Sequence, residues 1–264
     1  MSRNEYREYE DDDRADDRYH QEDEHQEVHD DGREYHYATE RDHELHGSDS
    51  RASVLIGNGS SDRLYGGRHD DRFEAGDGDD YLDGGSGIDT SVHHGRRSDY
   101  LLEKNGTGYL LQSRSQSGGS DQLLNVERLQ FADATLALDI DGHAGQMYRL
   151  YQAAFNRAPD NDGLKYWIGR MDQGLSLGNA ADAFTGSSEF QALYGGSHPD
   201  PALLVKLLYR NALHREADDD GLGYWAGRYQ SGSVDKATLL AAFSESAENQ
   251  AAVIGVIGDG IVLY

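Results

Sequence analysis

Cysteine is absent from the 264 residues, which excludes disulfide bonds and thiolate metal sites but says nothing by itself about the compartment. Long apolar runs are absent too, so we expect no transmembrane span. The first residues, MSRNEYREYEDDD, lack the apolar core of a secretory signal. We therefore expect a soluble protein that would leave the cell only by a route that does not use its N-terminus.

Known catalytic signatures are missing as well. There is no glycine-rich phosphate loop, and no Ser, His and Asp arrangement for nucleophilic catalysis can be placed. The segment HELHG, residues 43–47, is one residue short of the H-E-x-x-H motif of zinc proteases. We therefore expect a protein that is not an enzyme.

Basic residues are too few to balance the acidic ones, and the formal net charge is −25. Residues 1–50 alone hold 19 Asp and Glu against six Arg, which predicts a disordered, acidic, histidine-rich tail. His43 and His46 would share one face of a helix there and could hold a transition metal, but solvated disorder is the simpler interpretation. The acidity disfavours nucleic acid as a partner and favours metal cations.

Glycine is abundant between residues 57 and 92, where the sequence repeats every nine residues: GNGSSDRLY, GGRHDDRFE, AGDGDDYLD and GGSGIDTSV. The sixth position of every repeat is aspartate, at Asp62, Asp71, Asp80 and Asp89. The eighth position of the repeats holds Leu64, Phe73, Leu82 and Ser91, and the eighth position of the nine residues that precede the first repeat (48–56) holds Leu55. A fixed period of this kind indicates stacked structural repeats.

Each repeat is predicted to combine a six-residue turn with a three-residue strand. Glycine permits positive φ angles, so the turn can aim carbonyl groups inward beside the aspartate. Successive turns would fall on opposite sides of a flattened coil, which places Leu55 in line with Phe73 and Leu64 in line with Leu82. The resulting clusters of oxygen ligands suit Ca²⁺ better than Mg²⁺. The alternative, a flexible linker, does not explain the unbroken period.

The repeats resemble the GGxGxDxUx nonapeptide of the RTX (repeats-in-toxin) exoproteins over residues 57–92. The resemblance implies a parallel β-roll, residues 51–92, that holds calcium between turns on the same side. The implied metal ligands are the carboxylates of Asp62, Asp71, Asp80 and Asp89, with backbone groups at Gly57, Gly59, Gly66, Arg68, Ala75, Asp77 and Gly78. Because the outer repeats depart most from the pattern, Asp71 and Asp80 are the strongest candidates.

A β-rich cap is predicted over residues 93–142, because the open end of a roll exposes backbone groups. Tyr100–Leu102 and Tyr109–Leu111 flank an Asn-Gly turn, which is a hairpin signal. The run Asp121–Asp133 resembles the segment that follows the repeats in many RTX-type proteins. The acidic run that begins at Asp139 is expected to shape a turn before the next helix rather than a further cation loop.

Residues 143–250 contain a duplication, in which LYQAAFNRAPDNDGLKYW (150–167) matches LYRNALHREADDDGLGYW (208–225). Apolar residues at i, i+3, i+4 and i+7 predict an amphipathic helix in each copy. We expect Asp160 and Asp218 to cap these helices rather than to bind calcium in abbreviated EF-hand loops, because neither loop has a Glu at its twelfth position.

The duplicated sequence resembles a bacterial helical family, domain of unknown function 4214, over residues 146–250. The resemblance implies an all-α fold and, by association with secreted and surface-layer proteins, attachment to polysaccharide or matrix. At core spacing, Trp167 and Trp225 are expected in the helical core rather than as sugar-stacking platforms. Arg157 and Arg215 are expected to pair with nearby carboxylates rather than with a ligand.

The last residues, AAVIGVIGDGIVLY (251–264), form an apolar C-terminal tail. They fit a final strand or helix packed on the helical domain, but analogy with RTX proteins favours an uncleaved signal for type I secretion. The whole sequence predicts a multidomain β plus α protein with a disordered acidic tail, a short parallel β-roll with a β cap, and a duplicated all-α domain.

The predicted function is that of a non-enzymatic calcium-binding protein, secreted by a type I system, that folds on calcium outside the cell and has a structural or surface- and matrix-associated role. The expected partners are calcium ions, the type I secretion machinery and cell-surface polysaccharide or lipopolysaccharide. The alternative is an adhesion module that binds such a glycan through the helical domain. A third class, a small secreted hydrolase, would need carboxylate pairs that the calcium interpretation already uses.

Overall fold

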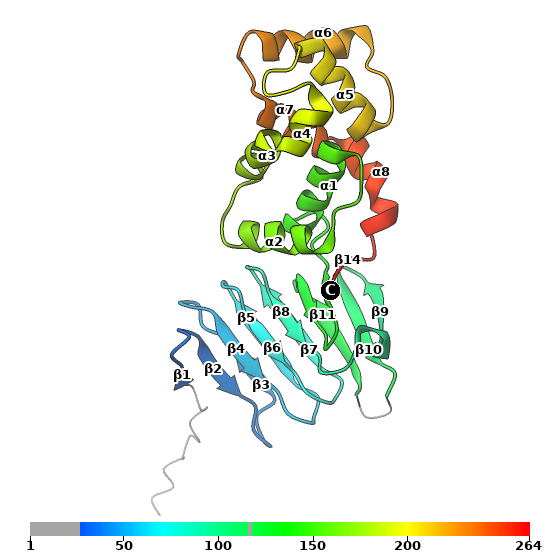
Figure 1. The fold of residues 1–264 in the computed structure, drawn as a ribbon. Coiled ribbons are helices and arrows are strands. Elements are labelled where there is room, and N and C mark those ends of the chain that lie inside the picture. The colour runs from blue at the N-terminus through cyan, green and yellow to red at the C-terminus, as the bar shows by residue number, and fades with distance from the viewer. Residues whose placement is uncertain (1–26, 116–117) are drawn as a thin grey trace, which may run out of the picture.

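The computed structural model describes residues 27–115 and 118–264, which form a coil of β-strands followed by a bundle of helices (Figure 1). A short 3-10 helix, Arg97–Asp99, interrupts the coil. The strands are β1 (Glu27–Val28), β2 (Glu34–Tyr37), β3 (Glu44–His46), β4 (Ser53–Ile56), β5 (Arg63–Gly67), β6 (Arg72–Glu74), β7 (Tyr81–Gly85), β8 (Thr90–Val92), β9 (Tyr100–Asn105), β10 (Gly108–Ser113), β11 (Ser120–Leu124), β12 (Arg128–Gln130), β13 (Thr135–Ala137) and β14 (Ile261–Leu263).

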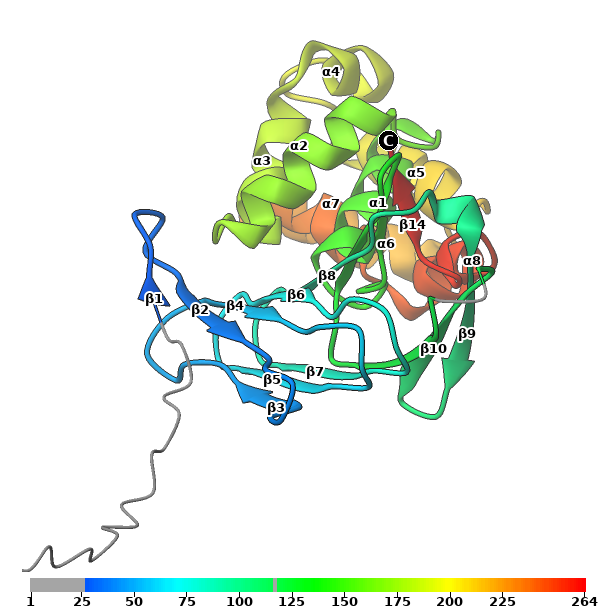
Figure 2. The same cartoon turned by 90° about the horizontal axis from the view of Figure 1, so that it is seen from below.

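The strands form two sheets that face each other. One sheet has the order β1-β2-β4-β6-β8-β12-β13-β14, and the other has the order β3-β5-β7-β11-β10-β9. Neighbouring strands are parallel from β2 to β12 in the first sheet and from β3 to β11 in the second. The chain therefore winds as a parallel β-solenoid, whose two layers and connecting turns are visible in Figure 2. This is the predicted β-roll.

The side chains predicted to line the interior of the coil do so. Leu55 lies opposite Phe73 in one sheet, and Leu64 lies opposite Leu82 in the other. All four are completely buried. Because each strand contributes only a few inward positions, this narrow line of apolar side chains is most of what holds the two layers together.

The predicted disorder of residues 1–50 is wrong for the part that the structure describes. Residues 1–26 lie outside the described residues, but β2 and β3 extend the two sheets by one strand each. His36 of β2 and Leu45 of β3 are buried at interior positions of the coil. Leu45 and Leu55 are ten residues apart, whereas equivalent positions of neighbouring repeats are nine residues apart. Because of this extra residue, the earlier turn does not fit the nine-residue period of the sequence.

The segment predicted as a β-rich cap contains the expected hairpin, in which β9 and β10 pair antiparallel through a turn at Gly106. In contrast, β11 and β12 run parallel to β7 and β8 and add a further turn to the roll. The predicted boundary at residue 92 therefore does not separate a roll from a cap. The hairpin is an insertion between two turns of one solenoid, and β13 then extends the first sheet antiparallel to β12.

The helices occur as two consecutive sets of four, which fits the predicted duplication but gives more helices per copy than the sequence pattern indicated. Asp160 and Asp218 cap equivalent helices, and each accepts a hydrogen bond of 2.7 Å from a backbone amide of the first turn. The first set is α1 (His143–Phe155), α2 (Asn161–Asp172), α3 (Leu177–Gly186) and α4 (Ser188–Tyr194); the second is α5 (Pro201–Leu213), α6 (Asp219–Gln230), α7 (Lys236–Ser244) and α8 (Ala247–Ile257).

The two tryptophans belong to the helical core, as predicted, although both are only half-buried. Trp167 packs edge-on against Phe184, with the ring centroids 5.1 Å apart. Trp225 packs against Phe243 in the equivalent place, at 5.7 Å. The duplicated sequence thus reproduces one packing arrangement twice.

The apolar C-terminal segment, residues 251–264, is folded into the molecule rather than a separate tail. It forms the second half of α8 and then β14, which pairs antiparallel with β13 and so joins the end of the chain to the sheet of the roll. Ile261 and Leu263 are buried there. Within residues 27–115 and 118–264 no helix has the length and apolar character needed to span a membrane.

Candidate calcium-binding turns

The four repeat aspartates lie in two columns of turns, one at each edge of the coil. We call turns 57–62 and 75–80 the first column, and turns 66–71 and 84–89 the second column. Stacked turns of a column touch through their backbones: Gly76, at φ +99°, lies against the carbonyl group of Asn58 so closely that no side chain would fit. The glycines are therefore required by the approach of one turn to the next.

One carboxylate oxygen of an aspartate ties each turn to the preceding turn of its column. The amide of Asp62 donates to Asp80 Oδ1 at 2.8 Å in the first column. In the second, the amide of Ser53 donates to Asp71 Oδ1 at 2.6 Å and that of Asp71 donates to Asp89 Oδ1 at 2.7 Å. These aspartates are at most 2% exposed, so their carboxylates are held in fixed positions away from water.

The second oxygen of three aspartates has no protein partner among the described residues. Oδ2 of Asp71, Asp80 and Asp89 is buried without a hydrogen bond. Because a buried carboxylate loses its hydration, its pKa rises, to about 6 for Asp71 and Asp80 and to about 8 for Asp89. A cation beside these oxygens would supply the missing charge partner.

Backbone carbonyl groups lie next to the free carboxylate oxygens. A Cβ built on Gly66 would lie 2.6 Å from both Asp71 Oδ2 and the carbonyl oxygen of Gly84. A Cβ built on Gly84 would lie 2.5 Å from Asp89 Oδ2 and would overlap the carbonyl oxygen of Asn125. Glycine thus leaves a space between two converging oxygens from stacked turns. Such an all-oxygen environment fits calcium.

Asp62, the aspartate of the first repeat, has a different environment. Its Oδ2 accepts a hydrogen bond of 2.8 Å from the amide of Asn58, which replaces a repeat glycine. Its Oδ1 lies 2.9 Å from Nδ1 of His43. Both oxygens are therefore already partnered. The prediction that the outer repeats are weaker candidates thus has a structural reason at Asp62 but none at Asp89, whose Oδ2 is unpartnered like those of Asp71 and Asp80.

The other predicted ligands lie in the same turns and would act through their backbones. Arg68 shows this most clearly, because its side chain is exposed and its guanidinium lies 3.6 Å from Asp49. The remaining positions are Gly57, Gly59, Gly66, Ala75, Asp77 and Gly78. In the described part of the chain no three His, Cys, Asp or Glu side chains gather as a metal cluster, so calcium here would depend on carbonyl as well as carboxylate oxygens.

Two carboxylates beyond the repeats continue the columns and were not predicted. The amide of Asp80 donates to Asp121 Oδ1 at 3.3 Å, and the amide of Asp89 donates to Glu127 Oε2 at 2.9 Å. Burial raises the pKa of Asp121 to about 8, and it also raises the pKa of Glu127. The inserted β9–β10 hairpin separates Asp121 and Glu127 from the repeats, so the nine-residue period of the sequence does not identify them.

The histidine pair of the predicted tail does not share a helix face. His43 contacts Asp62, whereas His46 lies on β3 with its ring stacked on Tyr65 at a centroid distance of 4.8 Å. The transition-metal alternative for these two histidines therefore has no support in this geometry, because His43 precedes β3 and contacts Asp62 whereas His46 lies on the strand.

The duplicated arginines form the ion pairs predicted for them. Arg157 Nε donates to Glu189 at 3.1 Å, and Arg215 Nε donates to Glu248 at 2.7 Å. Each pair ties the segment that follows the first helix of its set to the start of the fourth helix, so the arginines stabilise the helical fold.

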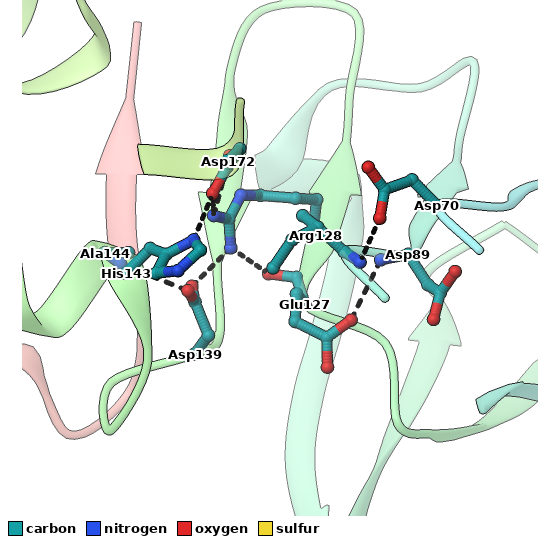
Figure 3. Close-up of polar contacts among 9 residues, drawn as sticks. Asp70, Asp89, Glu127, Arg128, Asp139, His143, Ala144 and Asp172 are labelled. Atoms are coloured by element: carbon teal, nitrogen blue, oxygen red, sulfur yellow. Dashed lines mark hydrogen bonds and ion pairs between the residues drawn. The ribbon is translucent and has the colours of Figure 1, made fainter. Parts of the chain in front are cut away.

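A polar bridge joins the last turn of the roll to the helices (Figure 3). Arg128 of β12 donates to Asp139 and, at 3.1 and 3.2 Å, to both carboxylate oxygens of Asp172 at the end of α2. His143 Nδ1 lies 2.9 Å from Asp172, and Asp139 accepts from the amide of Ala144 at 3.1 Å. Asp139 thus shapes the start of α1, as predicted, and Arg128 fixes the helices against the roll.

Comparison with known proteins agrees with this division of the chain. Residues 56–90 match the family model of the RTX calcium-binding nonapeptide repeat (4 copies). Residues 143–194 and 181–253 match the model of the domain of unknown function DUF4214. The first family is calcium-binding, and both are generally non-catalytic.

Similarity to individual proteins is limited. No curated protein sequence matches the chain. The crystal structure of the extracellular lipase LipA from Serratia marcescens is similar over 39% of this chain and 19% of the lipase, at 18% sequence identity and a TM-score of 0.22. This chain therefore spans about a fifth of the lipase, and a likeness of this extent carries no functional inference.

Proposed function

We propose that this protein is non-enzymatic, is exported, folds on calcium outside the cell and has a structural or surface-associated role. The proposal starts from the combination of RTX calcium-binding nonapeptide repeats with a duplicated DUF4214 region. The observation that carries the proposal is the set of buried, unpartnered carboxylate oxygens of Asp71, Asp80 and Asp89 beside backbone carbonyls. Oxygens placed in this way without a cation destabilise the fold.

We propose calcium ligands in both columns, with each ion held between stacked turns of the same column. They are the carboxylates of Asp62, Asp71, Asp80 and Asp89, and the backbone groups of Gly57, Gly59, Gly66, Arg68, Ala75, Asp77 and Gly78. Six to eight oxygens are the usual shell of Ca²⁺, and flexible glycine turns can adjust to its longer ligand distances. Within this set Asp71, Asp80 and Asp89 contribute most, since their second oxygens have no other partner.

Calcium would couple folding to the extracellular environment. Without it, the crowded carboxylates repel one another, and one apolar side chain per repeat cannot offset that repulsion together with the entropy of ordering glycine turns. Extracellular calcium modules bind at about 10⁻⁴ to 10⁻³ M. Ambient calcium at about a hundred times the Kd of one site would add about 2.7 kcal/mol to the stability of the folded roll.

Hydrogen exchange with and without calcium tests this proposal on the full chain. We expect amides of residues 57–92 to be protected only when calcium is present, and amides of α1 to α8 to serve as the internal reference because they keep most of their protection in chelator. Equal protection of residues 57–92 in both conditions would falsify calcium-dependent folding of the roll.

We propose that the apolar C-terminal segment, residues 251–264, acts as the signal for export by a type I system. Substitutions in this segment test the proposal. Truncation would confuse export with folding, because β14 belongs to the sheet. Val256 and Tyr264 are 69% and 74% exposed, so Val256→Asp with Tyr264→Asp changes the segment without opening the core. We expect the double variant to stay in the cytoplasm while Val28→Asp, an exposed apolar control, is exported. Normal export of both variants would show that this segment is not the secretion signal.

A second candidate function, adhesion to glycan, is supported by an exposed aromatic residue repeated in both helical copies. Tyr166 and Tyr224 are 55% and 54% exposed, and each carries an arginine over its ring, Arg170 and Arg228. Aromatic faces flanked by hydrogen-bond donors are suited to sugar rings. A glycan array with the wild type and Tyr166→Ala/Tyr224→Ala decides this: binding lost in the double variant supports adhesion, and no binding by the wild type rejects it.

A further inference from the structure

The loop between β11 and β12 occupies the next place in the second column, although it is not a nonapeptide repeat. β11 and β12 continue the two sheets after β7 and β8, so residues 125–127 stack on turn 84–89. Asn125 has φ +51°, a left-handed conformation that asparagine tolerates better than most residues. Its side-chain amide donates to Asp83 Oδ1 at 2.8 Å, which fixes the turn.

The backbone of this loop reproduces the oxygen arrangement of a repeat turn. The carbonyl oxygen of Asn125 lies beside Gly84 and Asp89 Oδ2, as the carbonyl oxygen of Gly84 lies beside Gly66 and Asp71 Oδ2 one turn earlier. Asp89 is completely buried, and its Oδ2 has no partner in the described structure. A second oxygen therefore converges on an unpartnered, buried carboxylate at a position outside the repeats.

Glu127 takes the place that aspartate has in a repeat. Its Oε2 accepts the amide of Asp89 at 2.9 Å (Figure 3). In the same way Asp89 Oδ1 accepts the amide of Asp71 at 2.7 Å. The 125–127 loop is shorter than turn 84–89, and it carries glutamate where the repeats carry aspartate. The backbone carbonyl of Glu127 is in turn held by Arg128 at 3.0 Å.

We propose that a calcium ion binds between turn 84–89 and the 125–127 loop, with Asp89 Oδ2, the carbonyl oxygen of Asn125 and the carboxylate of Glu127 among its ligands. The inference rests on the proposed calcium function and extends it to residues beyond the matched repeats. The site would close the second column at the point where the roll meets the helices.

The test is calcium stoichiometry of the full chain, measured by equilibrium dialysis with Glu127→Gln and Glu103→Gln. The Glu127→Gln change keeps an oxygen for the Asp89 amide but removes the charge, whereas Glu103 is exposed on β9 and serves as the charge-matched control. We expect Glu127→Gln to bind one calcium fewer, or to bind its last calcium at least about tenfold more weakly. The control should match the wild type.

The outcomes separate this inference from the proposed function. A wild type that binds no calcium overturns both, and a wild type that binds calcium identically to Glu127→Gln overturns only the site at Glu127. If Glu127→Gln does not fold, Glu127→Asp keeps the charge on a shorter arm, and hydrogen exchange of amides 84–89 in calcium is measured instead. Protection lost there and retained at 57–62 supports the site, and unchanged protection rejects it.

Discussion

The aspartates of the roll differ in how much of their carboxylate the protein itself satisfies. Asp62 has protein partners on both oxygens, whereas Asp80 uses Oδ1 for the Asp62 amide and leaves Oδ2 unpartnered. Aspartates at the same repeat position therefore differ in how much they need a bound calcium ion. At Asp62 the amide of Asn58 already provides a partner for the oxygen that is left without one at Asp80.

This difference predicts unequal effects of Asp62→Asn and Asp80→Asn. The calcium concentration at the midpoint of folding, followed by far-UV circular dichroism, should rise by at least about tenfold for Asp80→Asn and by less than about threefold for Asp62→Asn. The two changes remove the same charge from equally buried residues, so each is the control for the other. Equal shifts would contradict the assignment of the free Oδ2 to calcium.

The raised aspartate pKa values predict an inverted pH dependence for the metal-free chain. Unfolded aspartate titrates near 3.9, whereas burial raises the pKa to about 6 at Asp71 and Asp80 and to about 8 at Asp89. The folded turns hold protons that the unfolded chain has already released. Their contribution to stability is therefore full below the unfolded pKa and is lost as the pH rises through the folded values.

Circular dichroism in chelator should accordingly show more ordered roll at about pH 5 than at about pH 8. Calcium should reverse the trend, since protons compete with it for the same oxygens. A metal-free roll that becomes more ordered as the pH rises would show that these carboxylates are ionised and satisfied without a cation.

Helices α2 and α6 use adjacent aromatic residues in opposite ways. Trp167 and Trp225 face the core, whereas the preceding Tyr166 and Tyr224 face outward. Neighbouring positions on an amphipathic helix point in different directions, which is why the spacing alone identified the tryptophans as core residues.

We expect Trp167→Ala to lower the free energy of unfolding by about 2–4 kcal/mol, somewhat less than for a fully buried tryptophan because its ring is half-buried. Tyr166→Ala is the matched control on the preceding residue; it loses an edge-on contact with Trp167 and should cost about 1 kcal/mol or less. Urea denaturation followed by helical circular dichroism measures both. A tryptophan variant as stable as the tyrosine variant would place Trp167 outside the core.

At the scale of the whole molecule, apolar and polar contacts join the roll to the helices. Ala137 of β13 and Ile261 and Leu263 of β14 belong to the hydrophobic cluster of the helical core. Arg128 is only 6% exposed and holds Asp139 and Asp172, and β14 brings the chain end back to β13. The same arginine follows Glu127 in the sequence. Order in the last turn of the roll and docking of the helices are therefore linked at the adjacent residues Glu127 and Arg128.

Arg128→Met is expected to destabilise this docking by about 3 kcal/mol, since it leaves two carboxylates without their cation. Arg157→Met removes an exposed ion pair and should cost less than about 1 kcal/mol. Hydrogen exchange at the start of α1 in calcium should increase only in the first variant. If both variants exchange alike, the bridge does not hold the helices.

Local sequence determined the repeat chemistry and the helix starts. The nine-residue period placed Leu64 and Leu82 in line, and Asp160 was predicted as a helix cap, because turns, strands and caps depend on residues a few positions apart. These features needed no knowledge of the rest of the chain. The glycine and aspartate pattern likewise predicted calcium from ligand chemistry alone.

Only the tertiary structure decided where the roll begins and ends. One extra residue after Leu45 and the hairpin before Asp121 shift the period, yet backbone pairing continues because a parallel ladder requires matching strands and not a constant loop length. The parallel ladder brings Glu127 beside Asp89, and antiparallel pairing of β14 with β13 brings the C-terminal Leu263 beside Thr135. Contacts between residues so far apart in the chain leave no periodic pattern in the sequence. These contacts place the candidate calcium site at Asp89 and Glu127 next to the helices.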